Sequence, residues 1–313
     1  MTKTILVTGA DGFIGKHLVR TLKGQDYTLS LMTHNEPSTE LQGMLDGRDR
    51  VTVGDISKTL TSADAFRDVE TVVHLATYAN VQKAVQEPLL DFAVSQHTAT
   101  LLDRMKAHEV PNFLFFSAGR VYGTPQREVV NETHPLEPIE PYGAGKLFGE
   151  TQAKLYARHG IQTTSLRVFS IYGPGQRAKP GSITGVVAIF AEKLLEEQPL
   201  KIYGDGSLQR NFLHVQDLAS LTTGIIEKGL WGETLNVASD TQVTIKELAE
   251  TLGEVIGVEP TITYEKAVDG DIPCIPSIEK LKRTFSPLNF TPFKKGLKNY
   301  VTWLRTDREG DIS

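Results

Sequence analysis

The stretch VTGADGFIG (7–15) lies between the apolar run TILVT (4–8) and a segment whose apolar residues recur at helical spacing. Gly9, Gly12 and Gly15 form a G-x-x-G-x-x-G run there. Glycine allows a tight turn, lets the backbone approach a pyrophosphate, and lets helix and strand pack closely. The amides that begin the helix then donate to that pyrophosphate. This context predicts a dinucleotide site, with contacts from Gly9, Asp11, Gly12, Phe13, Ile14 and Gly15.

The first half of the chain continues with alternating apolar strands and amphipathic helices. Strands are expected at 27–32, 50–54, 70–76, 112–117 and 163–169, and helices near 87–108 and 142–159. This alternation predicts an α/β fold of Rossmann type, a doubly wound parallel sheet covered by helices on both faces. After Phe169 the alternation weakens, and stretches rich in Gly and Pro appear. We therefore expect a dinucleotide-binding domain at 1–169, a smaller, intertwined α/β substrate lobe at 170–304, and a frayed tail at 305–313.

The composition argues against several classes of protein. Of the 313 residues, 40% are apolar and 23% are charged, an ordinary balance for a soluble protein. The net charge of −5 argues against nucleic-acid binding. No stretch is long and apolar enough to span a membrane, and the chain opens without a signal-peptide pattern, so we expect a cytoplasmic protein. The single cysteine, Cys274, and the spacing of the histidines predict no metal site.

The end of the second expected strand bears on the choice of dinucleotide. An NAD site usually places Asp or Glu there, where the carboxylate holds the ribose 2′-hydroxyl. Here LMTHNEPS (31–38) offers Thr33 and His34 instead. Without a carboxylate a 2′-phosphate is admissible, yet no Arg stands there to bind it, so NAD and NADP both stay open. After the third expected strand, Asp55 and Ile56 in GDI (54–56) are expected near the adenine.

A tyrosine and a lysine four residues apart occur in PYGAGKLFGE (141–150). This spacing puts Tyr142 and Lys146 on one face of the helix expected there. A free tyrosine has a pKa near ~10 and is a poor base at neutral pH, but a nearby ammonium stabilises the phenolate and lowers that pKa. Lysine is also long enough to hydrogen-bond a cofactor ribose. Beside a nicotinamide, the pair is suited to exchange a proton with a sugar or alcohol hydroxyl.

Further motifs follow in order: HLA (74–76), VYG (121–123), RVFSIYGPGQ (167–176) and IYGDGSLQRNFLHVQDLA (202–219). With the glycine run and the Tyr-Lys pair, they make the chain resemble an extended short-chain dehydrogenase/reductase of the nucleotide-sugar epimerase/dehydratase type, similar to UDP-glucose 4-epimerase. The resemblance implies a Rossmann domain with a C-terminal lobe that binds a nucleotide-diphosphate sugar. It also implies NAD or NADP chemistry at a sugar carbon, commonly C4, and a homodimer packed through the helices near 90–108 and 142–159. The contacts it implies are Leu75, Ala76, Thr77 and Phe169 for the cofactor, and Tyr78, Ser170 and Arg210 for the substrate.

The chain departs from the family pattern at several positions. The family's catalytic Ser or Thr, four positions before the Tyr of VYG, is Ala118 here, and Ser117 lies one position earlier. We expect a bend at Gly119 to bring Ser117 into the site, for catalysis and for substrate contact. On the substrate side, Ser170 and Val268 stand where the family commonly has Asn and Arg. These losses weaken the prediction of the substrate more than that of the fold.

Three functions remain open at this point. In a nucleotide-sugar 4-epimerase, Tyr142 takes the C4 hydroxyl proton, the nicotinamide takes the hydride, and the keto sugar turns before the hydride returns. In an NADPH-dependent 4-keto nucleotide-sugar reductase, Tyr142 donates the proton, and the missing acid at Thr33 favours this alternative. A non-catalytic dinucleotide-binding sensor or scaffold is favoured by Ala118 and Val268, but the intact Tyr-Lys pair argues against it. A 4,6-dehydratase is disfavoured, because SAGRVYG (117–123) lacks the Asp-Glu pair expected after its catalytic Thr.

Overall fold

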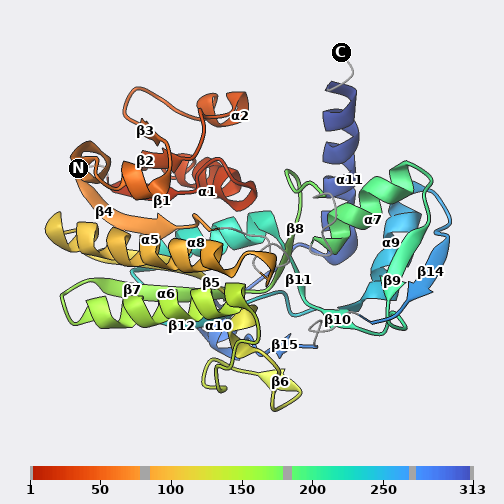
Figure 1. Ribbon diagram of the computed structural model, residues 1–313. Helices are drawn as coiled ribbons and strands as arrows, with labels where there is room; N and C mark the ends of the chain where they lie inside the picture. The colour runs from red at the N-terminus through yellow and green to blue at the C-terminus, as the bar shows by residue number, and fades with distance from the viewer. Residues whose placement is uncertain (1–2, 78–84, 179–184, 268–272, 311–313) are drawn as a thin grey trace. The chain divides into compact units, whose positions relative to one another are not determined.

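The computed structural model describes residues 3–77, 85–178, 185–267 and 273–310 (Figure 1). The chain divides into two compact units. Unit 1 comprises Met1–Val121, Glu140–Arg167 and Leu218–Leu235, and unit 2 comprises Tyr122–Ile139, Val168–Asp217 and Asn236–Ser313. A single boundary at Phe169 would place residues 122–139 in the first unit and residues 218–235 in the second. In the structure, residues 122–139 belong to unit 2 and residues 218–235 belong to unit 1.

The largest sheet has seven strands in the order β12-β7-β5-β4-β1-β2-β3. They are β1 (Thr4–Thr8), β2 (Thr28–Thr33), β3 (Arg50–Val53), β4 (Val69–His74), β5 (Asn112–Ala118), β7 (Gln162–Val168) and β12 (Thr234–Val237). The pairs β1–β2, β1–β4, β2–β3 and β4–β5 are parallel. All five residues of β1 are buried, as expected of a strand covered on both faces. The predicted α/β doubly wound Rossmann fold is confirmed.

The strand order reverses at β1, because the chain adds β2 and β3 on one side and then returns to add β4 on the other. In open parallel sheets, ligands bind beyond the carboxyl ends of the strands at such a reversal. The glycine-rich turn follows β1, and the HLA motif runs from the last residue of β4 into the segment after it. The topology thus brings both predicted cofactor segments to one edge of the sheet.

Helices pack against this sheet. In Figure 1, α5 (Pro88–Ala107) and α6 (Pro141–Ala157) run side by side along it. Leu101 and Met105 of α5 and Ala153 of α6 lie in one buried cluster with Phe113 and Phe115 of β5. Among the described residues, the other helical segments wholly or mostly in unit 1 are α1 (Phe13–Lys23), α2 (Thr39–Gln42), α3 (Ile56–Thr59), α8 (Val215–Lys228) and the 3-10 turns η1 (Ala63–Phe66) and η2 (Gly119–Tyr122).

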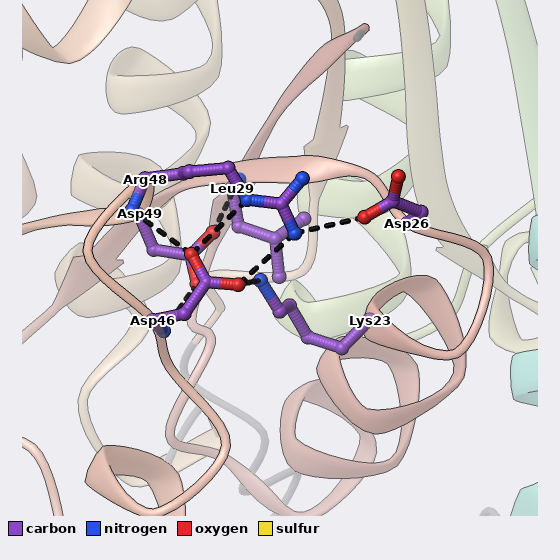
Figure 2. Close-up of polar contacts among 6 residues, drawn as sticks. All are labelled: Lys23, Asp26, Leu29, Asp46, Arg48 and Asp49. Carbon is purple, nitrogen blue, oxygen red and sulfur yellow. Dashed lines mark hydrogen bonds and ion pairs between the residues drawn. The ribbon is translucent and has the colours of Figure 1, made fainter.

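A polar cluster holds the connection between α2 and β3 (Figure 2). The Asp49 side chain is fully buried and accepts hydrogen bonds from the Leu29 amide and the Lys23 ammonium, both at 2.8 Å. The Lys23 ammonium also donates to Asp46 at 2.7 Å, and Arg48 donates to Asp46 at 3.0 Å. The end of α1 is thereby tied to the start of β2 and to the loop that leads into β3.

Unit 2 is built from short strands and helices. Its two-stranded sheets, within the described residues, pair β10 (Gln209–Arg210) with β13 (Val243–Thr244), β11 (Phe212–His214) with β8 (Ser170–Tyr172), β14 (Ile262–Glu265) with β9 (Leu200–Tyr203), and β15 (Ile275–Pro276) with β6 (Val129–Val130). The helices of its described part are α7 (Val186–Leu195), α9 (Ile245–Ile256), α10 (Glu279–Thr284) and α11 (Phe293–Gly310).

Helix α11 corrects the expected frayed tail, because it continues to Gly310. Leu297, Tyr300, Val301 and Leu304 recur at helical spacing and are all buried in the core of unit 2. Beyond Leu304, Arg305 donates to the Ile256 carbonyl oxygen at 3.0 Å and Arg308 donates to Glu196 at 2.7 Å, and these bonds hold the last turns of the helix. Residues 311–313 lie outside the described residues.

None of the helices in the described ranges combines the length and the apolar character needed to cross a bilayer.

Candidate active site

The glycine-rich turn between β1 and α1 has the geometry of a phosphate cradle. Gly9 has φ +70°, in the region that glycine adopts without strain. A Cβ atom on Gly15 would lie 2.3 Å from the Gly9 carbonyl oxygen, so only glycine lets α1 pack onto the turn. Gly12 is the N-cap of α1, with no side-chain cap and no acidic residue in the first turn, which Phe13 and Ile14 begin. The start of α1 therefore suits an anion, and the turn fits the pyrophosphate of a dinucleotide.

The turn rests on the end of β2. The amides of Gly9 and Ala10 both donate to the Met32 carbonyl oxygen, at 3.0 and 3.3 Å. The next residue, Thr33, is only 3% exposed, and its hydroxyl has no hydrogen-bond partner among the described residues. His34 follows and is exposed. A buried hydroxyl of this kind at this position fits a site that a ligand completes.

Asp11 of the same turn contacts the loop after β2. Its two carboxylate oxygens accept hydrogen bonds from the Ser38 amide at 2.7 Å and from the Ser38 hydroxyl at 2.5 Å. Ser38 is the N-cap of α2 and was not among the predicted site residues. A Ser followed by a short helical segment is a recognisable cap signal, but its partner Asp11 lies 27 positions earlier in the chain.

The segments after β3 and β4 lie at the same edge of the sheet. Asp55 is exposed between β3 and α3, and Ile56 begins α3. After β4, the Leu75 amide donates to the Thr8 carbonyl oxygen at 3.3 Å, and the Ala76 amide donates to the Thr8 hydroxyl at 3.2 Å. These bonds hold the HLA segment against the end of β1, beside the glycine-rich turn.

His74 of this motif is structural. Its Nδ1 atom lies 2.7 Å from the Thr8 hydroxyl and its Nε2 atom lies 3.1 Å from the Thr98 hydroxyl. Complete burial, with a smaller effect of the Lys146 charge, lowers the pKa of His74 to about 3. The imidazole is therefore neutral at physiological pH and joins β1, β4 and α5.

Tyr142 lies in the first turn of α6, where Glu140 caps the helix. The Glu140 carboxylate accepts hydrogen bonds from the Tyr142 amide at 3.0 Å and the Gly143 amide at 2.9 Å. A Cβ atom on Gly143 would lie 2.6 Å from the Arg120 carbonyl oxygen. The cap and this close approach fix where the helix begins, and so fix the backbone that carries Tyr142.

Lys146 is 6% exposed and its ammonium donates to the Phe116 carbonyl oxygen at 2.7 Å. The same nitrogen lies 5.7 Å from the centroid of the Tyr142 ring. The predicted pair therefore converges on one place. The pocket there is lined by Ala76, Thr77, Ser95, Thr98, Phe115, Tyr142, Gly145 and Lys146.

The side chain of Ser117 is buried against α6. Strand β5 continues to Ala118, so the turn at Gly119 begins too late to redirect the side chain. Ser117 shares the face of Phe115, which packs against Gly149 of α6. Its hydroxyl donates to Glu150 of α6 at 2.6 Å and is 3% exposed. Ser117 therefore does not line the pocket beside Tyr142, because a one-residue shift along a strand reverses the face. Its catalytic and substrate-binding role stays a prediction.

The partner of Ser117 belongs to a buried ion pair. Glu150 is fully buried, and its two oxygens accept hydrogen bonds from Arg167 of β7 at 2.8 and 3.0 Å. The hydroxyl of Ser117 completes this bidentate pair. Burying both charges is tolerated because each one has partners. The cluster joins β5, α6 and β7, and it holds the helix that carries the Tyr-Lys pair.

The other predicted site residues lie elsewhere in the chain. Phe169, Ser170 and Arg210 belong to unit 2. The Phe169 ring stacks on Tyr122, with centroids 6.3 Å apart, and the Arg210 guanidinium donates to the Gln209 carbonyl oxygen at 3.1 Å. Tyr78 lies outside the described residues. Among the residues that the structure describes, no group of three or more His, Cys, Asp or Glu side chains could hold a metal ion.

The model of the NAD dependent epimerase/dehydratase family matches residues 5–238. The chain belongs to this family. Within it, the chain is 31% identical to a putative UDP-glucose 4-epimerase from Methanocaldococcus jannaschii, over 97% of this chain and 99% of that one. It is 28% identical to the UDP-glucose 4-epimerase of Thermus thermophilus, solved as a complex with NAD, with a TM-score of 0.85 over 96% of this chain and 99% of that one. It is also 28% identical to a dTDP-4-dehydro-6-deoxy-D-allose reductase from Streptomyces bikiniensis, over 97% and 96% of the two chains.

Membership of this NAD-dependent family establishes the class of enzyme and of cofactor that the motifs predicted. Its members among the relatives include both epimerases and a reductase. The family relation therefore fixes nucleotide-sugar chemistry at a coarse level and leaves the choice between these reactions open.

Proposed function

We propose that this protein is an NAD-dependent nucleotide-sugar 4-epimerase in which Tyr142 exchanges a proton with the C4 hydroxyl of the sugar. The observation that carries the proposal is the pocket that Tyr142 and Lys146 share beside the end of β4. The similarity to two proteins described as UDP-glucose 4-epimerases supports the choice of reaction. A UDP-linked hexose is accordingly the first substrate to test.

Lys146 prepares Tyr142 for proton exchange. Its ammonium is buried and anchored to the Phe116 carbonyl oxygen, so the charge has a fixed position near the Tyr142 ring. A cation this close favours negative charge on the phenol oxygen, which lets the phenol act as a base toward a hydroxyl and as an acid toward the resulting oxygen anion. Both halves of an epimerisation need a proton transfer, in opposite directions.

The remaining residues of the site would hold the dinucleotide. The glycine-rich turn and the start of α1 would bind the pyrophosphate through backbone amides. Thr33 would face the adenosine ribose, and Ala76 and Thr77 would line the nicotinamide end beside Tyr142. A nicotinamide bound there would supply the acceptor, and then the donor, for the hydride at C4.

The second candidate is an NADPH-dependent 4-keto nucleotide-sugar reductase. One observation favours it, because the end of β2 carries Thr33 where an NAD enzyme usually has an acid. The similarity to a 4-keto-sugar reductase is consistent with it. A reductase would use the same Tyr142–Lys146 pair, with Tyr142 donating a proton in one direction. Ala118 leaves a third candidate, a non-catalytic dinucleotide-binding protein.

One experiment separates these candidates. The purified chain is denatured and the released nucleotide is identified by mass spectrometry, and the native protein is then assayed with UDP- and dTDP-linked hexoses. Because an epimerase regenerates its cofactor, we expect stoichiometric NAD⁺ and inversion at C4 without added cofactor. Turnover only with added NADPH and a 4-keto sugar would replace the epimerase by the reductase. A dinucleotide bound without turnover of any such sugar would leave the non-catalytic protein.

A homodimer formed through α5 and α6 is also proposed. Leu89 of α5 is 80% exposed, and Phe148 and Leu155 of α6 are 45% and 48% exposed. Phe148 and Leu155 are seven positions apart, so they lie on one face of α6. A second copy of these helices would cover this apolar surface.

A further inference from the structure

We propose that Asp11, fixed by Ser38, makes the ribose site select NAD⁺ over NADP⁺ and replaces the acid that is missing at Thr33. The inference rests on the proposed dinucleotide site and goes beyond it, because it assigns cofactor choice to a carboxylate of the glycine-rich turn. In the usual arrangement that carboxylate comes from the end of β2.

The backbone places Asp11 beside the end of β2. The amides of Gly9 and Ala10 donate to the carbonyl oxygen of Met32, which directly precedes Thr33. The glycine-rich turn and the ribose end of the site are therefore in direct contact. Asp11 is the residue after Ala10 and is partly exposed, so a ligand in the turn can reach it.

Ser38 holds the Asp11 carboxylate in place. The carboxylate accepts two hydrogen bonds from Ser38, one from the amide and one from the hydroxyl, at one oxygen each. Each carboxylate oxygen has a further lone pair, which a ribose hydroxyl can use. The loop 34–37 is therefore anchored at both ends. Thr33 before it belongs to β2, and Ser38 after it is hydrogen-bonded to Asp11. The Asp11 carboxylate, which would discriminate between NAD⁺ and NADP⁺, is held in place by tertiary contacts, whereas the usual acid is part of strand β2.

The charges nearby oppose a 2′-phosphate. Lys16 and Arg20 of α1, the next cations along the helix, are both engaged by Glu40, at 2.6 and 2.8 Å. Residues 33–38 contain no Lys or Arg that could bind a 2′-phosphate. A phosphate on the ribose would meet the Asp11 carboxylate at short range, whereas a hydroxyl would donate to it. The Thr33 hydroxyl, which has no hydrogen-bond partner within the described part of the chain, suits the same ribose hydroxyl.

The test measures binding and does not depend on turnover. The full chain is stripped of bound nucleotide, and the Kd values of NAD⁺ and NADP⁺, and of ADP-ribose and its 2′-phosphate, are measured by calorimetry. For the wild type we expect NAD⁺ to bind about 100-fold more tightly than NADP⁺. In Asp11→Asn we expect the ratio to fall to about tenfold or less, mainly through tighter NADP⁺ binding. Ser38→Ala, which keeps the carboxylate but loosens it, should give an intermediate ratio.

Glu36→Gln is the matched control, because it removes one negative charge from the same loop at an exposed position. We expect it to leave the ratio close to that of the wild type. An equal wild-type affinity for both dinucleotides, or a ratio unchanged in Asp11→Asn, would overturn the inference while the proposed enzyme stands. Binding of neither dinucleotide would overturn the proposed function itself. Thermal unfolding of each variant establishes that the comparison is made on folded protein, and Ser38→Ala decides the matter if Asp11→Asn does not fold.

Discussion

At the scale of single residues, Tyr142 and Lys146 carry the proposed chemistry. Their separation in sequence was sufficient to predict that they share a helix face, because four residues make about one turn of an α-helix. The burial of Lys146 and its bond to the Phe116 carbonyl oxygen were not visible in the sequence. Both depend on β5, because the Phe116 carbonyl oxygen belongs to this strand, 30 positions before Lys146 in the chain.

Replacing Tyr142 by Phe removes the oxygen that exchanges the proton and leaves the ring. We expect kcat to fall by about 10²–10⁴-fold, the usual contribution of a positioned acid or base. The Kd for NAD⁺ should stay near the wild-type value, because the glycine-rich turn is untouched. Kinetics of C4 inversion and calorimetry measure the two quantities. Tyr203→Phe, at an exposed tyrosine of β9, is the control. Full activity of Tyr142→Phe would contradict the mechanism.

Replacing Ser117 by Ala tests whether its hydroxyl stabilises the fold or acts in catalysis. The hydroxyl donates to the buried Glu150 carboxylate, so its loss should lower the free energy of unfolding by about 1–3 kcal/mol. We expect kcat to change little, because Arg167 still holds Glu150 and α6 keeps its place. Urea unfolding and steady-state kinetics give both values. A large loss of kcat at unchanged stability would instead support the catalytic role predicted for Ser117.

At the scale of elements, the cluster of Figure 2 joins α1, β2 and the loop before β3 through charged groups. Burial alone would lower the pKa of Lys23, but its hydrogen bonds to Asp46 and Asp49 outweigh burial and raise that pKa above 10.5. Hydrogen bonds from Arg48, and then from Lys23, hold the pKa of Asp46 below 3.8. The contribution of Lys23 is therefore lost as the pH rises through its raised pKa, and that of Asp46 is lost as the pH falls through its lowered pKa.

Replacing Lys23 by Met should weaken this cluster in a pH-dependent way. Between about pH 5 and pH 9 Lys23 and Asp46 are both charged in the wild type. In this range we expect the substitution to lower the free energy of unfolding by about 1–3 kcal/mol. The difference from wild type should shrink toward both extremes of pH. Urea unfolding across this range measures it. Lys3→Met removes an exposed ion pair with Glu70 and should cost at most about 1 kcal/mol. A loss independent of pH would show that the packing of Lys23 matters and its charge does not.

At the scale of the whole molecule, the Rossmann architecture could be predicted because each strand and helix carries its own periodic signal. The division into units could not, because it depends on contacts between distant segments. The Ser165 amide donates to the Glu233 carbonyl oxygen at 2.9 Å, and the Gly232 amide donates to that of Thr163 at 3.0 Å. These bonds join β7 to a segment almost 70 positions later. They bring residues 218–235 back into unit 1.

The proposed homodimer is a property of the whole molecule. Phe148→Glu places a charge on the exposed apolar face of α6, and we expect it to convert the dimer to a monomer because a second helix can no longer bury that face. Sedimentation equilibrium measures the mass. Tyr264→Glu, at a 53% exposed position of β14 in unit 2, should leave the assembly unchanged. A monomeric wild type, or a Phe148→Glu protein that stays dimeric, would contradict this interface.

The sequence by itself determined the features that are local along the chain. The glycine spacing, the helix that follows it and the four-residue step from Tyr142 to Lys146 each depend on a few neighbouring residues, so backbone geometry alone predicts them. The tertiary structure decided which side chains meet across the sheet. Ser117 faces Glu150 because β5 keeps its pleat through Ala118. Asp11 meets Ser38 because the turn after β1 packs on the end of β2. Such pairings depend on strand face and strand order, which no short stretch of sequence encodes.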